Sequence, residues 1–242
     1  MEFTPIAVAA ACASGLVMRR LRAPKLAAQA ARGAFIVFEG IDRCGKTTQS
    51  ETLVEKLRSE GVEVCHMRFP DRTTQVGTMI NAYLTGGVEI DDAAVHLLFA
   101  ANRWEARSEI MTKLNAGCTI VCDRYSFSGV VFTAAKGTLS REWCMAPEVG
   151  LPAPDLVLYL DLTVEDAMQR GSFGEERYER EDMQRKVHEI FTTEFTVRPR
   201  WTAVDAKRAI DAIQADVQRL ARAEVAKQAD AATAAPIGKL WE

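Results

Sequence analysis

Short apolar runs alternate with longer amphipathic stretches along most of the chain. The runs are rich in β-branched and aromatic residues, which is typical of buried strands. They predict strands in the run that ends at Gly40 and at residues 62–69, 119–122, 155–162 and 201–204. The stretches between them carry apolar residues at helical spacing. They predict a helix that ends at Gly61 and helices at residues 74–84, 91–115, 125–136, 182–195 and 205–229.

This alternation predicts an α/β fold, a doubly wound five-stranded parallel sheet flanked by helices. Residues 155–162 form an almost continuous apolar run, which suits a parallel strand covered on both faces. Thr163 and Asp166 resemble a capping box and predict a further helix directly after that strand. Because the sequence has no internal repeat, we expect a single domain at residues 33–242, with a loosely held tail after Ala231.

The N-terminal extension, residues 1–32, differs from the rest of the chain. Glu2 is its only acid, whereas five of its residues are basic: Arg19, Arg20, Arg22, Lys25 and Arg32. The basic residues follow an apolar stretch, the reverse of their order in a secretory signal, and an arginine-rich, acid-poor leader is typical of mitochondrial import. The alternatives are a disordered extension or a start site assigned too early. The expected location is the cytoplasm or nucleus, with mitochondrial import as the other possibility.

Composition narrows the classes of partner. The chain has 242 residues, 30 Lys and Arg, 33 Asp and Glu, and a formal net charge of −3. This balance does not indicate a nucleic-acid partner, so a nucleotide has to be held by local arginines. The six cysteines contain no C-x-x-C pair, which predicts reduced thiols in an intracellular protein without a zinc framework. No segment is long enough to span a membrane, and we expect no membrane partner.

The residues after the first strand match a phosphate-binding loop. Gly40 to Thr47 fits G-x-x-x-x-G-K-[ST], with a strand before it and a helix after it. Glycines let backbone N–H groups turn toward an anion, Lys46 adds a mobile positive charge, and the helix presents its positive dipole end. The Thr47 hydroxyl suits Mg²⁺. We expect ATP to be held by Gly40, Ile41, Asp42, Arg43, Cys44, Gly45, Lys46, Thr47 and Thr48.

Further candidates follow other strands of the predicted sheet. Ligands of such sheets lie at the carboxyl ends of the strands. The loop at residues 40–47, Arg72, Asp123 with Arg124, and the loop at residues 171–178 are therefore expected to lie together. Asp123 ends a strand as an acid of the Walker B type does, and we expect it to hold Mg²⁺ beside Thr47.

Phosphoryl transfer requires positioning and charge neutralisation, so arginines are the next candidates. They are Arg43, Arg72, Arg103, Arg124, Arg170 and Arg177. Position alone favours Arg43, inside the loop, and Arg124, beside the candidate acid. Three phenylalanines are predicted near the same strand ends or on facing helices: Phe69, Phe99 and Phe132. One of them either stacks on a base or, like most aromatics at helical spacing, belongs to the core.

Several spaced blocks of sequence, in order, resemble the thymidylate kinase family, most closely its eukaryotic form. They run from about Arg32 to Trp241 and leave the leader outside. The blocks are residues 39–49, 68–72, 98–105, 123–129, 150–155 and 170–179, with a terminal match at 238–241. The resemblance implies transfer of the ATP γ-phosphate, in the presence of Mg²⁺, to dTMP, giving dTDP. It also implies the nucleoside monophosphate kinase fold with a mobile lid at residues 170–179.

The resemblance also implies roles for residues around the phosphates. Asp42 is similar in place to a carboxylate that holds the sugar 3′-hydroxyl, and Arg72 and Arg124 match arginines that contact phosphate. Family members differ in whether the transition-state arginine comes from the loop or the lid, and Arg43 matches the loop type. Such an arginine is worth roughly 10³–10⁵ in rate. The implied catalytic set is Lys46, Arg43, Arg72, Arg124 and Asp42, with Arg170 on the ATP side.

Other positions match contacts to the nucleoside. Phe99 matches the ring that stacks on thymine, and Arg103 matches the donor to a thymine carbonyl. Phe132 matches an aromatic near the sugar 2′ position, which would disfavour ribonucleotides. The remaining expected substrate contacts are Phe69, Ser128 and Tyr178.

Cys44 departs from the family pattern, which usually has a smaller residue at this position. A thiol exposed beside a lysine and a helix N-terminus would have a lowered pKa, and its oxidation would then block ATP binding. The alternative is a neutral substitution.

The sequence leaves two other functions open. One is a different nucleoside monophosphate or deoxynucleoside kinase, because a thymine methyl contributes only about 1–3 kcal/mol of discrimination. The other is a nucleotide-binding regulator without catalysis, although Lys46, Arg43, Arg72 and Asp123 are all present. Members of the family are usually homodimers. The Ala- and Leu-rich face of residues 91–115 either forms such an interface or packs in the core.

Overall fold

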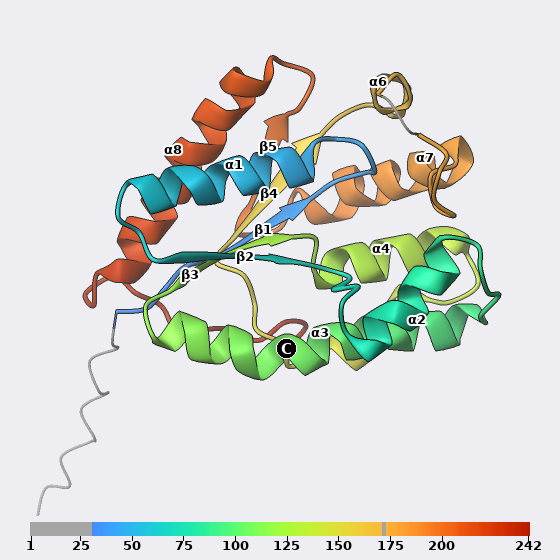
Figure 1. Cartoon of the computed structure of the whole chain (residues 1–242), viewed down its shortest axis with the longest axis horizontal. Coiled ribbons are helices and arrows are strands. Elements are labelled where there is room, and N and C mark those ends of the chain that lie inside the picture. The colour runs from blue at the N-terminus through green and yellow to red at the C-terminus, as the bar shows by residue number, and fades with distance from the viewer. Residues whose placement is uncertain (1–30, 171–172) are drawn as a thin grey trace, which may run out of the picture.

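A parallel sheet forms the centre of the fold (Figure 1). The computed structural model describes residues 31–170 and 173–242, so most of the predicted extension and residues 171–172 of the lid lie outside the described residues. Five strands pair in the order β2-β3-β1-β4-β5, all parallel, which confirms the predicted α/β class. They are β1 (Phe35–Glu39), β2 (Val64–Arg68), β3 (Thr119–Asp123), β4 (Leu156–Asp161) and β5 (Trp201–Asp205).

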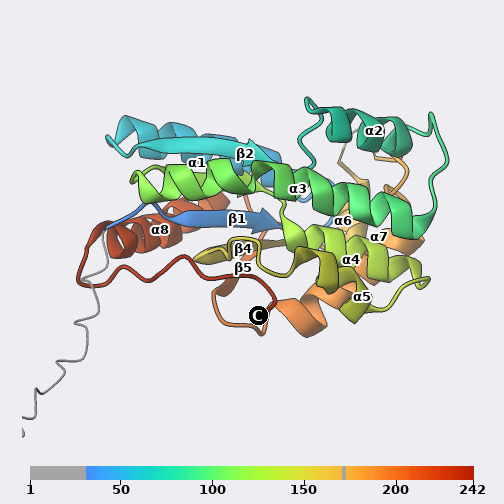
Figure 2. The same ribbon diagram turned by 90° about the horizontal axis from the view of Figure 1, so that it is seen from below.

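Helices cover both faces of the sheet. Figures 1 and 2 show α1 and α8 over one face and α3 and α4 over the other. The helices are α1 (Lys46–Ser59), α2 (Gln75–Leu84), α3 (Asp92–Asn115), α4 (Ser126–Lys136), α5 (Arg141–Met145), α6 (Val164–Met168), α7 (Glu181–Ile190) and α8 (Ile210–Ala229). A 3₁₀ turn, η1 (Ala146–Glu148), follows α5, and a π-helical turn, η2 (Phe191–Phe195), follows α7.

The register of the sheet brings three loops to one edge. Phe38 of β1 lies opposite Asp123 of β3, and Asp123 lies opposite Arg68 of β2. The loops after β1, β2 and β3 therefore leave the sheet side by side at its carboxyl edge. All five residues of β1 and of β3 are buried, so the sheet supports these loops from a packed core.

Caps begin two of the helices at the predicted positions. Asp91 accepts hydrogen bonds from the N–H groups of Ala93 at 2.9 Å and Ala94 at 3.3 Å, which starts α3. Thr163 accepts the N–H of Asp166 at 3.2 Å, which starts α6. Both are N-cap bonds that satisfy donors left without partners in the first helical turn.

Two helices of the C-terminal half differ from their predictions. The helix expected at residues 205–229 begins at Ile210, because Asp205 ends β5 and its carboxylate then accepts the N–H of Lys207 at 2.9 Å in a turn. The helix expected at residues 182–195 begins at Glu181 and ends at Ile190 before the π-helical turn. The short helix α5 was not predicted, since five residues are too few to show a helical period.

The tail after Ala231 is not loosely held, contrary to the prediction. Leu240 is buried, and its N–H donates to the Leu151 carbonyl at 2.8 Å. The Trp241 indole donates to the Ser126 hydroxyl at 3.0 Å, and its ring lies edge-on to Phe127 with 5.4 Å between centroids. Figure 2 shows the segment after α8 running back along the sheet to the C-terminus. Burial of two large apolar side chains accounts for the docking.

Arg32, at the start of the described chain, is joined to the domain. Its guanidinium donates to both carboxylate oxygens of Asp155, at 2.8 and 2.6 Å. Asp155 also accepts the N–H of Phe35 at 2.8 Å. This ion pair ties the beginnings of β1 and β4 together at the amino edge of the sheet.

Candidate active site

The phosphate loop, residues 40–47, leaves β1 and enters α1. Gly40 has φ 148°, and a Cβ there would lie 2.8 Å from the Leu160 carbonyl oxygen, so only glycine fits. Arg43 has φ 62°, a left-handed conformation that is uncommon outside glycine and recurs at functional sites. The ammonium of Lys46 donates to the Ile41 carbonyl across the loop. The backbone of the loop therefore has the conformation that a phosphate-binding motif requires.

A cavity of about 720 Å³ lies at the carboxyl edge of the sheet. Most of the predicted site residues line it: Asp42, Arg43, Cys44, Gly45, Lys46, Thr47, Thr48, Phe69, Arg72, Phe99, Arg103, Asp123, Arg124, Ser128, Phe132, Arg170 and Tyr178. Gly40 and Ile41 do not line it, although their carbonyls hold Arg124 and Lys46. Arg177 instead contacts Glu89 and lies 4.2 Å from the Tyr83 ring centroid, away from the cavity.

Cys44 is not exposed, contrary to one of the two alternatives for this residue. Its side chain is 1% exposed, and the Lys46 ammonium lies 3.4 Å from its sulfur. The structure therefore favours a neutral substitution that fills space under the loop.

Asp123 and Thr47 form the polar pair expected beside the phosphates. The Thr47 hydroxyl donates to Oδ2 of Asp123 at 2.6 Å. Oδ1 of Asp123 is buried and has no hydrogen-bond partner among the described residues. A buried carboxylate oxygen without a partner is costly, so this oxygen suits a cation or a cation-bound water. In the part of the chain that the structure describes, no group of three or more His, Cys, Asp or Glu side chains is arranged so that it could hold a metal ion.

Arg124 links the loop to α4. One of its nitrogens donates to the Gly40 carbonyl at 3.1 Å and to Ser128 Oγ at 3.0 Å, and the other pairs with Oδ1 of Asp42. Burial opposes its charge, but the attraction of Asp42 and neighbouring carboxylates outweighs this and raises the pKa of Arg124. Its φ is 67°, so it is a second site arginine in the left-handed region. The guanidinium stays charged at the cavity wall.

Glu39 holds the beginning of α4 in place. It is fully buried and accepts the N–H groups of Tyr125 and Ser128 at 3.0 and 3.1 Å and the Ser128 hydroxyl at 2.5 Å. Burial raises the pKa of Glu39, against the opposing effects of these hydrogen bonds and of Arg124. The carboxyl fixes the first turn of α4, and with it the Ser128 side chain at the cavity.

The described lid residues bind the two arginines nearest to them. Arg43 donates to Glu179 at 2.8 and 3.2 Å, which raises the pKa of Arg43. Glu179 Oε2 also accepts the N–H groups of Gly174 and Glu175, at 2.9 and 3.0 Å. Arg72 pairs with Glu176 at 2.7 Å. Lid carboxylates therefore lie against cations that face the cavity.

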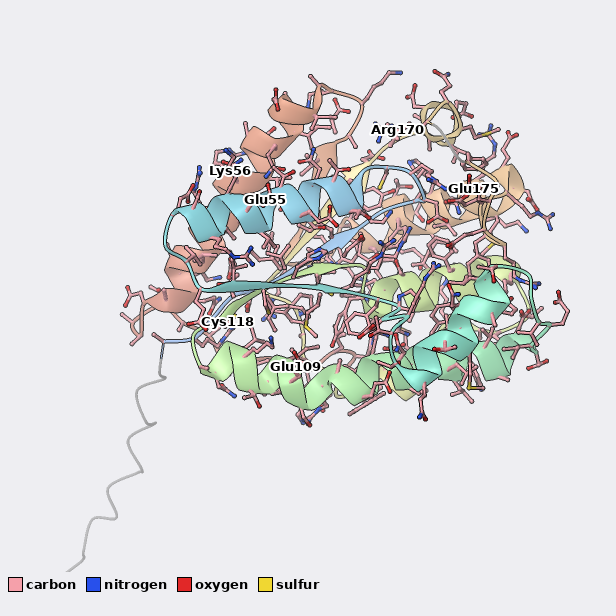
Figure 3. The ribbon with its side chains drawn as sticks, in the orientation of Figure 1. Glu55, Lys56, Glu109, Cys118, Arg170 and Glu175 are labelled. Carbon is pink, nitrogen blue, oxygen red and sulfur yellow. The ribbon has the colours of Figure 1, made fainter. Side chains whose placement is uncertain are left out.

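Arg170 holds the lid's other end against the phosphate loop. It donates to the Arg43 carbonyl at 3.0 Å and to the Ala206 carbonyl at 2.9 Å. Figure 3 shows Arg170 and Glu175 at one end of the molecule and Cys118, just before β3, at the other. The lid thus stands over the carboxyl edge of the sheet.

The far end of the cavity carries rings and one buried arginine. Phe132 and Tyr178 lie 5.7 Å apart between ring centroids, tilted against each other. Arg103 is 2% exposed and donates through Nε to Glu148 at 2.9 Å, with a second, shorter bond through Nη2. Glu148 thus holds the guanidinium plane through Nε and Nη2, and Arg103 lines the cavity.

Sequence patterns did not single out five polar residues that hold this site together: Glu39, Glu148, Glu176, Glu179 and Gln184. Each acts on a predicted residue that is distant in sequence. A weak signal existed for Glu39, a charged residue at the end of a buried strand, and for Glu176 and Glu179, which lie in a block that resembles the family.

Comparison with known proteins gives consistent matches. The model of the family described as "Thymidylate kinase" matches residues 38–217. A "Thymidylate kinase" of Homo sapiens is 45% identical over 216 residues, covering 88% of this chain and 99% of that protein. One of Arabidopsis thaliana is 46% identical over 210 residues, covering 87% of this chain and 78% of that protein. A solved thymidylate kinase structure from Candida albicans superposes with a TM-score of 0.75 at 35% identity, covering 83% of this chain and 95% of that one.

Proposed function

The chain belongs to the thymidylate kinase family, and from this premise we propose which of its residues carry out the reaction. The activity is that of a phosphotransferase that phosphorylates dTMP to dTDP with ATP. The observation that carries the assignment is one cavity with a phosphate loop at one end and a ring-lined pocket at the other. The cations that line it include Arg43, Lys46, Arg72 and Arg124.

The ATP end of the cavity is formed by the phosphate loop and Arg170. The N-terminus of α1 and the loop N–H groups favour bound phosphate oxygens. Lys46 would leave the Ile41 carbonyl to reach the terminal phosphates, and Arg43 would leave Glu179 to meet the transferred group. Catalysis of this kind depends on neutralising charge spread over the transferred phosphoryl group, so these two movements are the central chemical contribution of the chain.

The dTMP end of the cavity is formed by residues from the loops after β1, β2 and β3, from α3 and α4, and from the lid. Arg72, released from Glu176, and Arg124 are proposed to hold the dTMP phosphate, and Asp42 the sugar 3′-hydroxyl. Phe99 is proposed to stack on thymine, and Arg103 to donate to a thymine carbonyl. The support for these roles is that all five line one cavity. Contacts with the sugar and base are assigned to Phe69, Ser128, Phe132 and Tyr178.

Thr47 and Asp123 are proposed to hold the Mg²⁺ that accompanies ATP. The buried Oδ1 of Asp123 without a partner fits such an ion, and hydroxyl and carboxylate oxygens are the ligands it prefers. When bound, Mg²⁺ supplies positive charge to the phosphate oxygens. The chain's own part is to hold the Thr47 hydroxyl and the Asp123 carboxylate in place through the 2.6 Å bond between them.

A homodimer is proposed through α3. Leu97 and Trp104 are 48% and 38% exposed and lie two helical turns apart on one face. An unpartnered apolar face of this kind suits a self-complementary interface. Sedimentation of Leu97→Glu should then show a shift from dimer to monomer, and a monomeric unsubstituted protein would refute the proposal.

The cytoplasm is proposed as the site of action. The five cysteines of the described residues are free thiols, which suits a reducing compartment. Among the same residues, no helix combines the length and apolar character needed to cross a bilayer. A fusion of residues 1–33 to a fluorescent protein tests the proposal, and a mitochondrial signal would overturn it.

The substrate assignment is tested by turnover of dTMP, dUMP, the ribose form of TMP, CMP and thymidine, each with Mg²⁺-ATP. Preference for dTMP over the ribose form of TMP is expected, because Phe132, whose ring centroid lies 5.2 Å from the Arg124 guanidinium, is proposed to lie near the sugar 2′ position. Lys46→Met serves as the inactive control. Preference for thymidine or CMP would contradict the nucleoside contacts while leaving the phosphate chemistry in place.

A further inference from the structure

Gln184 of α7 is a buried amide whose three hydrogen bonds all reach site segments. Its side chain is fully buried, and it does not line the cavity. Its oxygen accepts the N–H of Asp42 at 2.9 Å. Its nitrogen donates to Oδ2 of Asp42 at 2.6 Å and to the Tyr178 carbonyl at 2.8 Å. Both hydrogens of the amide nitrogen are therefore used.

The first consequence concerns the orientation of Asp42. One carboxylate oxygen pairs with Arg124 and the other with Gln184, while the Asp42 N–H is held by the same amide. The side chain of Asp42 is therefore fixed at both oxygens and at its backbone. Each oxygen still has a lone pair for a substrate hydroxyl, and its direction is set by these partners.

The second consequence concerns the lid. Tyr178 lies at the end of the lid, and its ring packs against Phe132 at the nucleoside end of the cavity. The amide that orients Asp42 also holds the backbone of Tyr178. A single side chain thus joins the phosphate loop, the lid and α7, three segments that are far apart in the sequence.

We propose that Gln184 is a positioning residue for sugar recognition, which aligns Asp42 with the 3′-hydroxyl and ties that alignment to the lid. This inference rests on the proposed role of Asp42. It assigns to Gln184 no contact with substrate. Only a carboxamide can accept from one N–H and donate to both a carboxylate and a carbonyl at the same place.

The test compares dTMP with 3′-deoxythymidylate, which lacks the hydroxyl that Asp42 would accept. For Gln184→Ala, kcat/KM for dTMP should fall roughly 10- to 100-fold, the range expected for losing hydrogen bonds to a charged group. The loss with 3′-deoxythymidylate should be much smaller, so the preference for the 3′-hydroxyl collapses. This ratio is internal to each preparation and does not depend on the fraction of protein that is folded.

Asp42→Asn separates this inference from the role on which it rests. If Asp42→Asn leaves the ratio unchanged, the proposed role of Asp42 is wrong. If Asp42→Asn collapses the ratio and Gln184→Ala does not, positioning by Gln184 is overturned. Glu181→Gln, an exposed change in the first turn of the same helix, is the matched control and should keep the ratio of the unsubstituted protein.

Gln184→Glu provides a second readout that a merely structural role would not move. It places a carboxylate against Oδ2 of Asp42, so activity relative to the unsubstituted protein should be lowest at high pH. Activity should recover as the pH falls, because protonation restores a donor between the two carboxyl groups. A relative activity that is independent of pH would contradict the proposal.

Discussion

Two arginine–aspartate pairs lie at opposite edges of the sheet, and they share their chemistry but not their surroundings. Arg32 and Asp155 close the amino edge, with side chains 4% and 5% exposed. Arg124 and Asp42 lie at the carboxyl edge, with side chains 16% and 21% exposed, and both line the cavity. The first pair stands where strands begin, and the second where loops leave the sheet.

The partners of each pair show what the difference means. Arg32 also donates to the Gly33 and Ala235 carbonyls at 2.8 Å each, and Asp155 also accepts the Phe35 N–H. All of these partners belong to the packed fold. The partners of Arg124 and Asp42 include Ser128, on the cavity wall, and Gln184, which also holds the lid. These surroundings suit the first pair to stability and the second to its proposed role in binding substrate.

The largest expected effect comes from removing a cation at the cavity edge. Arg43→Gly should lower kcat at least about 100-fold with little change in the affinity for dTMP, since a charge-stabilising arginine is worth roughly 10³–10⁵ in rate. Glycine accepts the backbone at φ 62°, so the change removes the side chain without strain. Steady-state kinetics measure it, with the exposed Arg58→Gln as control. A mild loss, or a loss confined to KM, would refute this role of Arg43.

The next largest effect is a loss of stability, expected at the amino edge of the sheet. Arg32→Ala leaves Asp155 buried without its partner and should lower the free energy of unfolding by about 3–5 kcal/mol. Denaturant unfolding followed by tryptophan fluorescence measures the change. The activity of the folded fraction should stay as it was, and a drop in kcat of folded protein would break the division between the two edges.

A smaller loss of stability is expected from the docked tail. Trp241→Ala removes the contact with Phe127 and the bond to Ser126, and should cost about 2 kcal/mol because the ring is only half-buried. Trp241→Phe should recover most of the packing but not the hydrogen bond. Thermal melts compare the three proteins. Equal midpoints would show that the tail contributes nothing to the fold.

The smallest expected effect is the pH dependence of stability that arises from His96, a side chain that burial keeps neutral. Burial lowers the pKa of His96 below its ordinary value of 6.5, with a smaller effect of nearby charges. The unfolded chain binds a proton at His96 below pH 6.5 where the folded chain does not. Stability should therefore fall as the pH drops below 6.5, by at most about 1.4 kcal/mol per pH unit for this residue.

His96→Gln provides the comparison for that slope. The amide can still bond with the Thr133 hydroxyl and the Cys144 carbonyl, which His96 contacts at 2.8 and 2.9 Å. The variant should show a shallower decline in unfolding free energy between pH 6.5 and 5. Identical slopes in both proteins would assign the acid sensitivity to other groups.

The sequence alone predicted the parts of the molecule that depend on short, local patterns of residues. The loop at residues 40–47 has fixed spacing, and Asp123 ends a strand, so parallel topology was enough to bring both to one edge. Gln184 and Glu148 show the limit of such reasoning. Gln184 meets Asp42, 142 residues away, and Glu148 meets Arg103, 45 residues away. No local spacing encodes these contacts, since they depend on how α7 and η1 pack.

The tail shows a different limit. Its Gly238-Lys239-Leu240-Trp241 segment has too few apolar residues for a periodic signal, yet two of them dock on the fold. Of the docking partners, Leu151 lies in the loop before β4 and Phe127 lies in α4, and only the tertiary structure brings them together.

The most direct test changes one aspartate to asparagine at each edge of the sheet. Asp42→Asn and Asp155→Asn make the same chemical change, and both unfolding free energy and kcat/KM for dTMP are measured for each. Asp42→Asn should lower kcat/KM at least about 10-fold with a small change in stability, and Asp155→Asn should do the reverse. Equal losses of activity in the two folded variants, or a larger loss of stability in Asp42→Asn, would contradict the separation of roles between the two edges.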